Sequence, residues 1–203
     1  DWPKPGDWRT DDLAGVPMLI ARGGDGVLRA FLNVCRHRGA KVADGCGHSS
    51  VFSCPYHAWT YGLDGRLRGI PDERAFEGVR AERRGLVSLP LVERHGLVWV
   101  MPTPAPDGAA AFDIDPWLGG LGPELASYHA GDYHLYDQRL VRETMNWKLL
   151  VDTFHESYHV GFLHKDSLTS ILIPNLSDFE PFGANHRLVF PRRSPVRGCA
   201  VAS

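Results

Sequence analysis

The sequence predicts an α+β protein in which a small antiparallel β domain precedes the beginning of an α+β domain. Between residues 16 and 101 the apolar residues form short, strand-sized runs separated by turn signals such as GGDG and LDG. Residues 102–111 (PTPAPDGAAA) are rich in Pro and Ala without periodicity, so they are interpreted as a connector. Beyond them, helix-like and strand-like segments follow one another, which is typical of α+β proteins.

The first part of the chain is interpreted as a series of antiparallel strands. Asp64 and Gly65 lie between two apolar runs and predict a tight hairpin, because primed turns need residues that accept positive φ. The segments with strand character are VPMLIAR (16–22), VLRAFLNV (27–34), VFSCP (51–55), WTYGL (59–63), RLRGI (66–70) and LVSLPLVERHGLVWVM (86–101).

The second part contains a predicted helix that begins near residue 146. In NWKLLVDTFHESYHVGFLH (146–164) apolar residues recur at helical spacing, and Asn146 is suited to cap the N-terminus. Before this segment, PELASYHA (123–130) is predicted to be helical and YHLYDQRLV (133–141) to form a strand. After it, HRLVF (186–190) is predicted to be a strand.

Composition excludes several functional classes. The chain has 203 residues, 43% hydrophobic content, a net charge of -2 and a pI near 6.6, which argue for a folded core and against nucleic-acid or anionic-membrane partners. The apolar runs are too short for a membrane-spanning helix. The opening DWPKPGDW lacks a Met and an apolar signal region, so the native beginning is not expected here. The four cysteines are too few for a disulfide scaffold and indicate a reducing, cytoplasmic setting and a metal: Cys35, Cys46, Cys54 and Cys199.

The first group of candidate ligands is a Cys-x-His pair followed by a Cys-x-x-His pair. Cys35 and His37 are separated by sixteen residues from Cys54 and His57. Two thiolates and two imidazoles can bind one tetrahedral zinc ion or a two-iron, two-sulfur cluster. Glycines and a proline in both loops, with aromatic residues beside the second, favour the cluster.

The second group of candidate ligands lies within residues 146–164 and allows two interpretations. His155, Glu156 and His159 form an HExxH pattern, which is typical of zinc hydrolases. Alternatively, His159 and His164 bind a metal. On an unbroken helix these two would lie about 140° apart, so the helix must deform or end between them. Gly161 is the residue expected to permit this.

The first group of ligands resembles the Rieske domain of ring-hydroxylating oxygenases, through the forms CxHRG and CPYHxW. The resemblance implies a [2Fe-2S] cluster with Cys35 and Cys54 on one iron and His37 and His57 on the other, with Arg38 and Trp59 beside it. Neutral histidine ligands remove negative charge and raise the reduction potential. The matching residues are Cys35, His37, Arg38, Gly39, Cys54, Pro55, Tyr56, His57 and Trp59.

The second segment resembles the catalytic motif of the same oxygenases. Asn146, Trp147 and Lys148 match its opening, Glu156 matches a bridging carboxylate, and His159 and His164 match two ligands of a mononuclear Fe(II). Asp152 and Thr153 occupy positions where many members have Glu-Asn. The resemblance assigns catalytic roles to Glu156, Asn146 and Asp152. Its third iron ligand is an Asp beyond residue 203, and none of Asp166, Asp178 and Glu180 is assigned that role.

The resemblance implies a Rieske [2Fe-2S] domain over residues 1–110 and the start of a helix-grip-like catalytic domain over residues 111–203. Such an oxygenase component receives electrons from NAD(P)H through a reductase and, in some systems, a ferredoxin. It uses O2 to hydroxylate or demethylate a small organic substrate, here expected to be aromatic. A homotrimer, in some systems with small β subunits, is implied, in which Glu156 would hydrogen-bond His159 and a neighbouring protomer's His57.

Two other functions remain as alternatives. A Rieske ferredoxin-like electron carrier would end near residue 110, whereas this chain continues with paired histidines. A zinc metallohydrolase acting through His155–His159 would leave the first group of ligands unexplained. The sequence does not assign the substrate or decide between mono- and dioxygenation.

Overall fold

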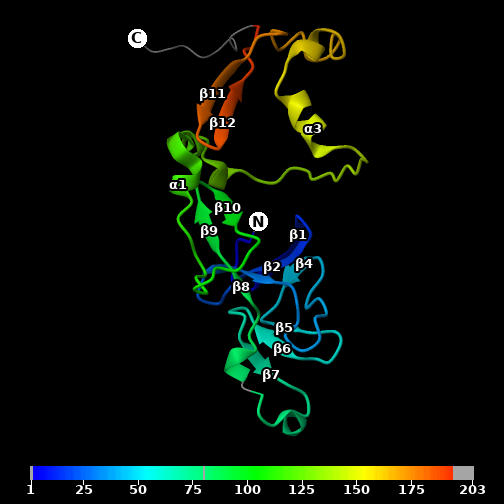
Figure 1. The fold of residues 1–203 in the computed structure, drawn as a ribbon, viewed down its shortest axis with the longest axis vertical. Coiled ribbons are helices and arrows are strands. Elements are labelled where there is room, and N and C mark those ends of the chain that lie inside the picture. The colour runs from blue at the N-terminus through cyan, green and yellow to red at the C-terminus, as the bar shows by residue number, and fades with distance from the viewer. Residues whose placement is uncertain (1, 80, 194–203) are drawn as a thin grey trace. The chain divides into compact units, whose positions relative to one another are not determined.

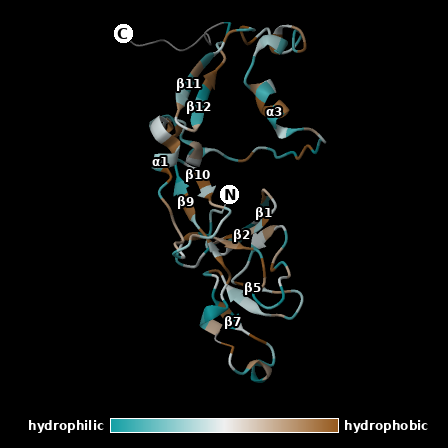
Figure 2. Cartoon of the chain, in the orientation of Figure 1, coloured by the Kyte–Doolittle hydropathy of each residue, from teal (hydrophilic) through white to brown (hydrophobic). Residues whose placement is uncertain are grey.

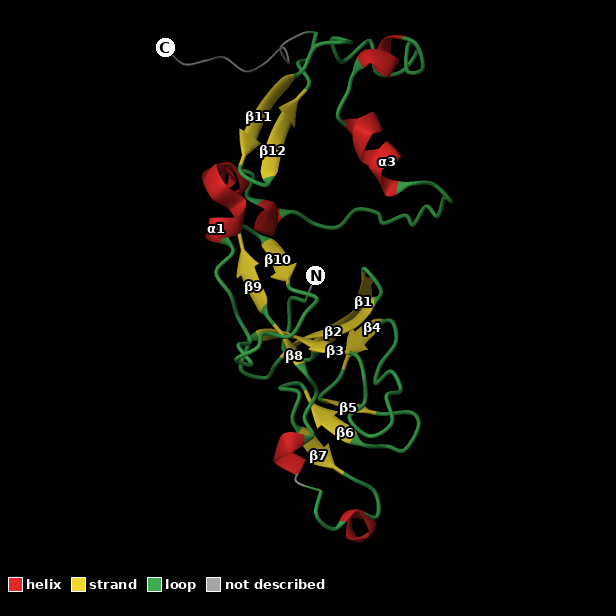
Figure 3. Cartoon of the chain, viewed as in Figure 1, coloured by secondary structure: helices red, strands yellow, loops and turns green. Residues whose placement is uncertain are grey.

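The computed structural model describes residues 2–79 and 81–193, so Cys199 lies outside the described part. The chain forms two compact units, Asp1–Ile114 with Leu125–His134 and Asp115–Glu124 with Leu135–Ser203. Their elements are labelled in Figure 1, coloured by hydropathy in Figure 2 and classified in Figure 3. None of the described helices is both long enough and apolar enough to span a membrane.

The first unit is built on a five-stranded antiparallel sheet with the strand order β4-β1-β2-β3-β8. A second, three-stranded antiparallel sheet has the order β5-β6-β7, and β9 pairs with β10. The strands are β1 (Asp7–Leu13), β2 (Val16–Arg22), β3 (Leu28–Leu32), β4 (Cys46–His48), β5 (Val51–Ser53), β6 (Thr60–Gly62), β7 (Leu67–Gly69), β8 (Ser88–Leu89), β9 (Leu91–Arg94) and β10 (Leu97–Val100). Short 3₁₀ helices are η1 (Glu73–Phe76), η2 (Ala81–Arg83) and η4 (Ala130–Asp132).

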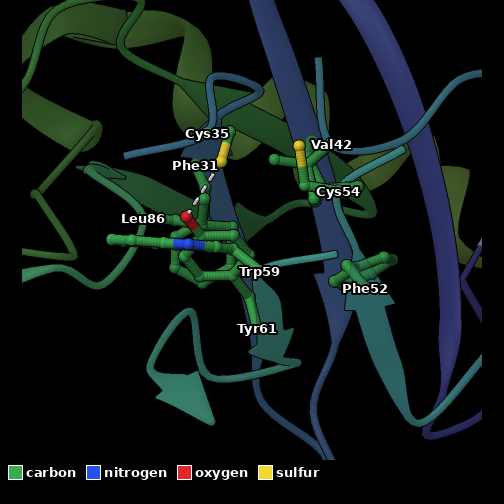
Figure 4. Close-up of a cluster of buried hydrophobic side chains, with 10 residues drawn as sticks. Phe31, Cys35, Val42, Phe52, Cys54, Trp59, Tyr61 and Leu86 are labelled. Atoms are coloured by element: carbon green, nitrogen blue, oxygen red, sulfur yellow. Dashed lines mark hydrogen bonds between the residues drawn. The ribbon is translucent and has the colours of Figure 1, made fainter. Parts of the chain in front are cut away.

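The central strand β2 separates two apolar cores. Leu19 and Ala21 belong to the first core and Met18 and Ile20 to the second, because successive residues of a strand point to opposite faces of the sheet. Burial on both faces explains why β2 reads as a nearly continuous apolar run. The first core, shown in Figure 4, also contains four residues of the candidate site: Cys35, Cys54, Trp59 and Tyr61.

The hairpin predicted at Asp64-Gly65 joins β6 to β7. Gly65 has φ +78°, and a Cβ there would collide with the ring of Phe31. Both the backbone conformation and the close packing therefore require glycine at this position.

The second unit combines short helices with one hairpin. β11 (Asp178–Phe182) pairs with β12 (Asn185–Val189), as predicted for the strand near 186–190. The predicted helix near 123–130 corresponds to α2 (Gly122–Ser127), and the helix predicted near 146 is α3 (Trp147–Phe154). The remaining elements are α1 (Asp115–Leu118), η3 (Gly119–Leu121) and η5 (Tyr158–Gly161). The α+β class, with an antiparallel β domain first, is confirmed.

Two expectations differ from the structure, and two strands were not predicted. Residues 133–141 form no strand, and Tyr136, fully exposed, and Leu140, 76% exposed, have no neighbouring strand to pack against. β1 and β4 were not predicted, because their sequences lack apolar alternation. α3 ends at Phe154, so Gly161 is not the residue at which this helix ends.

Candidate functional site

The first ligand loop, residues 35–40, is a tight turn that follows β3. The backbone N–H of Cys35 donates to the carbonyl of Ala40 at 2.8 Å, and the N–H of Gly39 donates back to the carbonyl of Cys35 at 3.0 Å. Gly39 has φ +79°, a conformation that glycine adopts without steric penalty. The turn places Cys35 at one end and His37 in its middle.

The second ligand loop, residues 54–59, repeats this hydrogen-bond pattern between β5 and β6. Cys54 N–H donates to the carbonyl of Trp59 at 2.9 Å, and Ala58 N–H donates to the carbonyl of Cys54 at 2.9 Å. Ala58 occupies the position equivalent to Gly39 and also has positive φ, +55°. Two short segments far apart in the sequence thus form the same turn, and each carries one cysteine and one histidine.

The two loops bring the histidines together and bury the cysteines. The rings of His37 and His57 have centroids 4.6 Å apart, with 61° between their planes. Cys35 and Cys54 are each only 3% exposed, whereas His57 is exposed. Figure 4 shows both sulfur atoms within the apolar surroundings of the first core. The site therefore has a buried thiol end and a more exposed imidazole end.

Aromatic side chains cover the imidazole of His37. The indole of Trp59 stacks on it, with centroids 4.9 Å apart and an interplanar angle of 7°, and Phe76 from η1 contacts it edge-on. Burial lowers the pKa of His37, and the charges of His57 and Arg38 lower it further. The neutral form, which binds metals, is therefore favoured. Arg38 itself is exposed.

Tyr61 is a site residue that the sequence analysis did not identify. Its buried hydroxyl lies 3.2 Å from Cys35 Sγ and accepts a hydrogen bond from the backbone N–H of Arg36 at 3.0 Å. Burial raises the pKa of Tyr61, and the contact with Cys35 adds to this, so the hydroxyl keeps a proton that can point at the sulfur. In the sequence, its position two residues after Trp59 was the signal that could have identified Tyr61 as a site residue.

The donor set and one orphaned atom fit a Rieske cluster. His37 Nδ1 is buried without a hydrogen-bond partner, which is unfavourable unless the nitrogen binds another group. In the described ranges, no three His, Cys, Asp or Glu side chains are grouped so as to hold one metal ion. The ligand candidates are instead two thiols buried in the first core and two imidazoles in ring contact, the donor set needed when two irons each take two protein ligands.

The second site begins at the capped helix α3. The side chain of Asn146 accepts a hydrogen bond from Lys148 N–H at 3.0 Å, so Asn146 caps the helix and its side chain is used in that bond. Asp152 lies exposed on α3, and its carbonyl accepts the N–H of His155, which ends the helix. Asn146 is thus the N-cap of α3, and the catalytic roles expected for Asn146 and Asp152 stay predictions.

Glu156 organises the turn that follows α3. Its carboxylate accepts hydrogen bonds from His159 Nδ1 and from the backbone N–H groups of Tyr158 and His159. These bonds, that from the His159 side chain first, lower the pKa of Glu156. Because Nδ1 of His159 is engaged, its Nε2 carries the available lone pair. The rings of His159 and His164 have centroids 5.4 Å apart, and two imidazoles suit Fe(II).

The HExxH interpretation does not fit this geometry. A zinc hydrolase motif needs both histidines on one face of a continuous helix. Here α3 ends at Phe154, and His159 lies in the separate 3₁₀ turn η5. His155 Nε2 lies 2.7 Å from His186 Nε2, so His155 interacts with β12.

Comparisons with known proteins identify the same family in both parts of the chain. The model of the Rieske [2Fe-2S] domain matches residues 1–90, and the model of the ring-hydroxylating α-subunit catalytic domain matches residues 124–200. The carnitine monooxygenase oxygenase subunit of Escherichia coli (strain K12) is 34% identical over 170 residues, covering 82% of this chain and 44% of that protein. The large oxygenase component of the 2,4-dinitrotoluene dioxygenase system of Burkholderia sp. (strain RASC) is 32% identical over 198 residues, covering 92% and 41%.

Solved structures show the same similarity. A crystal structure of the quaternary ammonium Rieske monooxygenase CntA with an inhibitor has a TM-score of 0.84 and 30% identity, covering 95% of this chain and 53% of that chain. Naphthalene 1,2-dioxygenase with bound indole has a TM-score of 0.71 and 31% identity, covering 83% and 38%. The present chain spans less than half the length of the curated relatives named above.

Proposed function

Because this chain belongs to the Rieske non-haem iron oxygenases, we propose that the full-length protein is the oxygenase component of a multicomponent enzyme. In such an enzyme the [2Fe-2S] cluster supplies one-electron transfer and the mononuclear Fe(II) supplies O2 activation. We assign the cluster to Cys35, Cys54, His37 and His57. We assign the iron to His159 and His164 with a carboxylate outside this chain.

The residues around the cluster have distinct tasks in this proposal. Trp59 and Phe76 shield His37 from water, and Tyr61 supplies a hydrogen bond to the sulfur of Cys35. Arg38 places a positive charge near the imidazole end. The hydrogen bond from Tyr61 and the charge of Arg38 stabilise added electron density at the site, which favours acceptance of an electron from a donor.

The observation that carries the proposal is the contact between Glu156 and His159. An anionic carboxylate fixes the tautomer of His159, so that Nε2 faces away from Glu156 and is available for iron. Glu156 is also 45% exposed in its side chain, so it can accept a further hydrogen bond. We propose that this second partner is His57 of a neighbouring protomer in a homotrimer.

The substrate and partners follow from the relatives as proposals. The full-length protein would receive electrons from a reductase, directly or through a ferredoxin. Relatives named for carnitine and glycine betaine make small quaternary ammonium compounds the first substrates to test. Aromatic compounds, as in the naphthalene and dinitrotoluene systems, are the second class. We also propose a reducing, cytoplasmic location for the protein.

We also propose that the Rieske domain covers residues 1–110 and the catalytic domain begins at residue 111. The support is the Pro- and Ala-rich segment 102–111, which has no regular secondary structure. This segment lies within the stretch 101–114, which separates β10 from α1.

The test uses full-length protein with both iron sites loaded under anaerobic conditions and mixed with a reductase, NADH and O2. Substrate-dependent oxygen uptake with carnitine or glycine betaine, accompanied by an oxygenated or demethylated product, is expected. The same assay with naphthalene and 2,4-dinitrotoluene tests the aromatic class. A cluster that reduces and reoxidises without substrate-dependent product in either class would instead support an electron carrier.

A further inference from the structure

Asn33 is a buried polar residue next to the first ligand loop. It follows β3, precedes Cys35 by two residues and is only 1% exposed. Its Nδ2 donates to the carbonyl of Ala43 at 2.8 Å, and its Oδ1 accepts the N–H groups of Val42 at 2.9 Å and of Ala43 at 3.2 Å. The side-chain amide therefore both donates to and accepts from the backbone of Val42 and Ala43, across the base of the loop.

The first ligand loop needs such support more than the second. The second loop is held by the β5-β6 ladder, in which Ser53 pairs with Thr60 immediately outside the loop. The first loop has β3 on one side only, because residues 41–45 form no strand on the other side. The side-chain amide of Asn33 supplies the donor and the acceptor that a neighbouring strand would provide.

An apolar residue at position 33 would leave three backbone groups of Val42 and Ala43 without these partners. Val42 is itself buried in the first core, alongside Cys35 and Cys54, so water cannot easily replace the lost bonds. The segment that returns from His37 to β4 would then be free to move. Its movement would shift Cys35 and His37 relative to the second loop.

We propose that Asn33 is a positioning residue for the iron-sulfur cluster. Its amide fixes the geometry of the first ligand loop and so sets the positions of one sulfur and one imidazole ligand. This inference rests on the ligand set proposed above, in which each loop supplies one ligand to each iron. Asn33 acts through the loop and touches none of the reacting atoms.

The experiment compares three variants of the full-length protein. Asn33→Leu removes all three side-chain hydrogen bonds at similar volume, and Asn33→Ser leaves a small hydroxyl that water can join. Leu91→Ala is the control, because Leu91 is buried in the second core, which contains none of the cluster ligands. The measurements are iron and sulfide content, the electron paramagnetic resonance spectrum of the reduced protein, the midpoint potential, and hydrogen exchange at Val42 and Ala43.

In folded Asn33 variants we expect the affinity of the site for iron to fall about 10- to 100-fold, as it does for other residues that orient metal ligands. The g values and midpoint potential should also change, and the amides of Val42 and Ala43 should exchange faster. Leu91→Ala should lower thermal stability while its folded fraction keeps the wild-type spectrum. If Asn33→Leu does not fold, the same measurements on Asn33→Ser decide.

Wild-type spectrum, potential and iron affinity in a folded Asn33 variant would overturn the proposal. If the proposed ligand set is wrong, a different result is expected. Cys54→Ser in an otherwise wild-type protein would in that case keep a normal Rieske spectrum. The two outcomes are distinguishable, because the first concerns residue 33 alone and the second concerns the ligands.

Discussion

Tyr61 Oη lies 3.2 Å from Cys35 Sγ while it accepts the backbone N–H of Arg36 at 3.0 Å. Because the backbone N–H of Arg36 donates to the hydroxyl oxygen, the hydroxyl proton of Tyr61 can be directed at the sulfur. A donor to a ligand sulfur stabilises the more negative, reduced state of a cluster and raises its potential.

Tyr61→Phe is therefore expected to lower the midpoint potential of the cluster. A hydrogen bond to a charged acceptor contributes about 1.5–3 kcal/mol, and only the part that differs between redox states shifts the potential. A decrease on the order of 50 mV follows, because 59 mV corresponds to a tenfold change for one electron. Redox titration followed by circular dichroism measures it. Tyr133→Phe, which removes a hydroxyl from an exposed ring of the first unit outside both ligand loops, should leave the potential unchanged.

Ala58→Gly is expected to stabilise the Rieske unit. Ala58 has φ +55°, where a Cβ is disfavoured by about 1–2 kcal/mol. The additional freedom of glycine in the unfolded chain opposes this gain by about 0.5–1 kcal/mol, so a net increase of about 0.5–1 kcal/mol remains. Calorimetric unfolding would measure the change. Gly39→Ala, at the equivalent position with open space around its Cα, should destabilise by a similar amount; equal stability of both variants and wild type would contradict the argument.

Glu156→Gln is expected to slow electron transfer between the two metal centres while both remain loaded. The amide cannot accept the three hydrogen bonds as an anion does, so the link to His159 weakens. A loss of about tenfold or more in rate corresponds to one charge-assisted hydrogen bond. Single-turnover oxidation of the reduced cluster by O2 with substrate reports this rate. Glu143→Gln makes the same change at an exposed residue before α3 and should oxidise at the wild-type rate.

The ion pair between Asp25 and Arg29 should make stability depend on pH in the acid range. Arg29 and the N–H of Val27 hydrogen-bond the carboxylate and hold the pKa of Asp25 far below its ordinary value of 3.8. Above pH 3.8 both folded and unfolded states are ionised, so the full contribution is present. As the pH falls towards the folded pKa, only the unfolded state binds a proton, and the contribution is lost.

The difference in unfolding free energy between wild type and Asp25→Asn should therefore be constant above pH 3.8 and shrink below it. Urea unfolding at a series of pH values measures it. Asp44→Asn, at an exposed carboxylate of the same unit, controls for the change in net charge. A difference that grows on acidification would reverse the sign expected for a lowered pKa.

The candidate ligand residues could be nominated from the sequence because their spacing follows from local turns. Cys35 and His37, or Cys54 and His57, lie within one turn each, so short-range pattern is enough to nominate them. The β2 strand and the α3 helix were equally readable, since β2 is a nearly continuous apolar run and α3 has helical periodicity with Asn146 as a good cap. These features depend little on the rest of the chain.

Features that depend on tertiary contact could not be read from the sequence. Tyr61 meets Cys35 across 26 positions, and Asn33 closes a loop onto residues nine and ten positions away. β1 is recognised by its ladder with β2, because its own sequence, DWRTDDL, is largely polar. After α3 ends at Phe154, the carboxylate of Glu156 holds the following turn through the N–H groups of Tyr158 and His159, and no periodicity indicates these contacts.

The parallel stacking of Trp59 on His37 also gives the protein a built-in optical reporter. An indole whose ring centroid lies 4.9 Å from that of a ligand imidazole is close enough to transfer its excitation to a cofactor that absorbs visible light. The emission of this tryptophan should thus be dark in the loaded protein and recover when the cofactor is lost. Fluorescence can therefore follow assembly and decay of the centre in dilute samples, where absorbance is too weak.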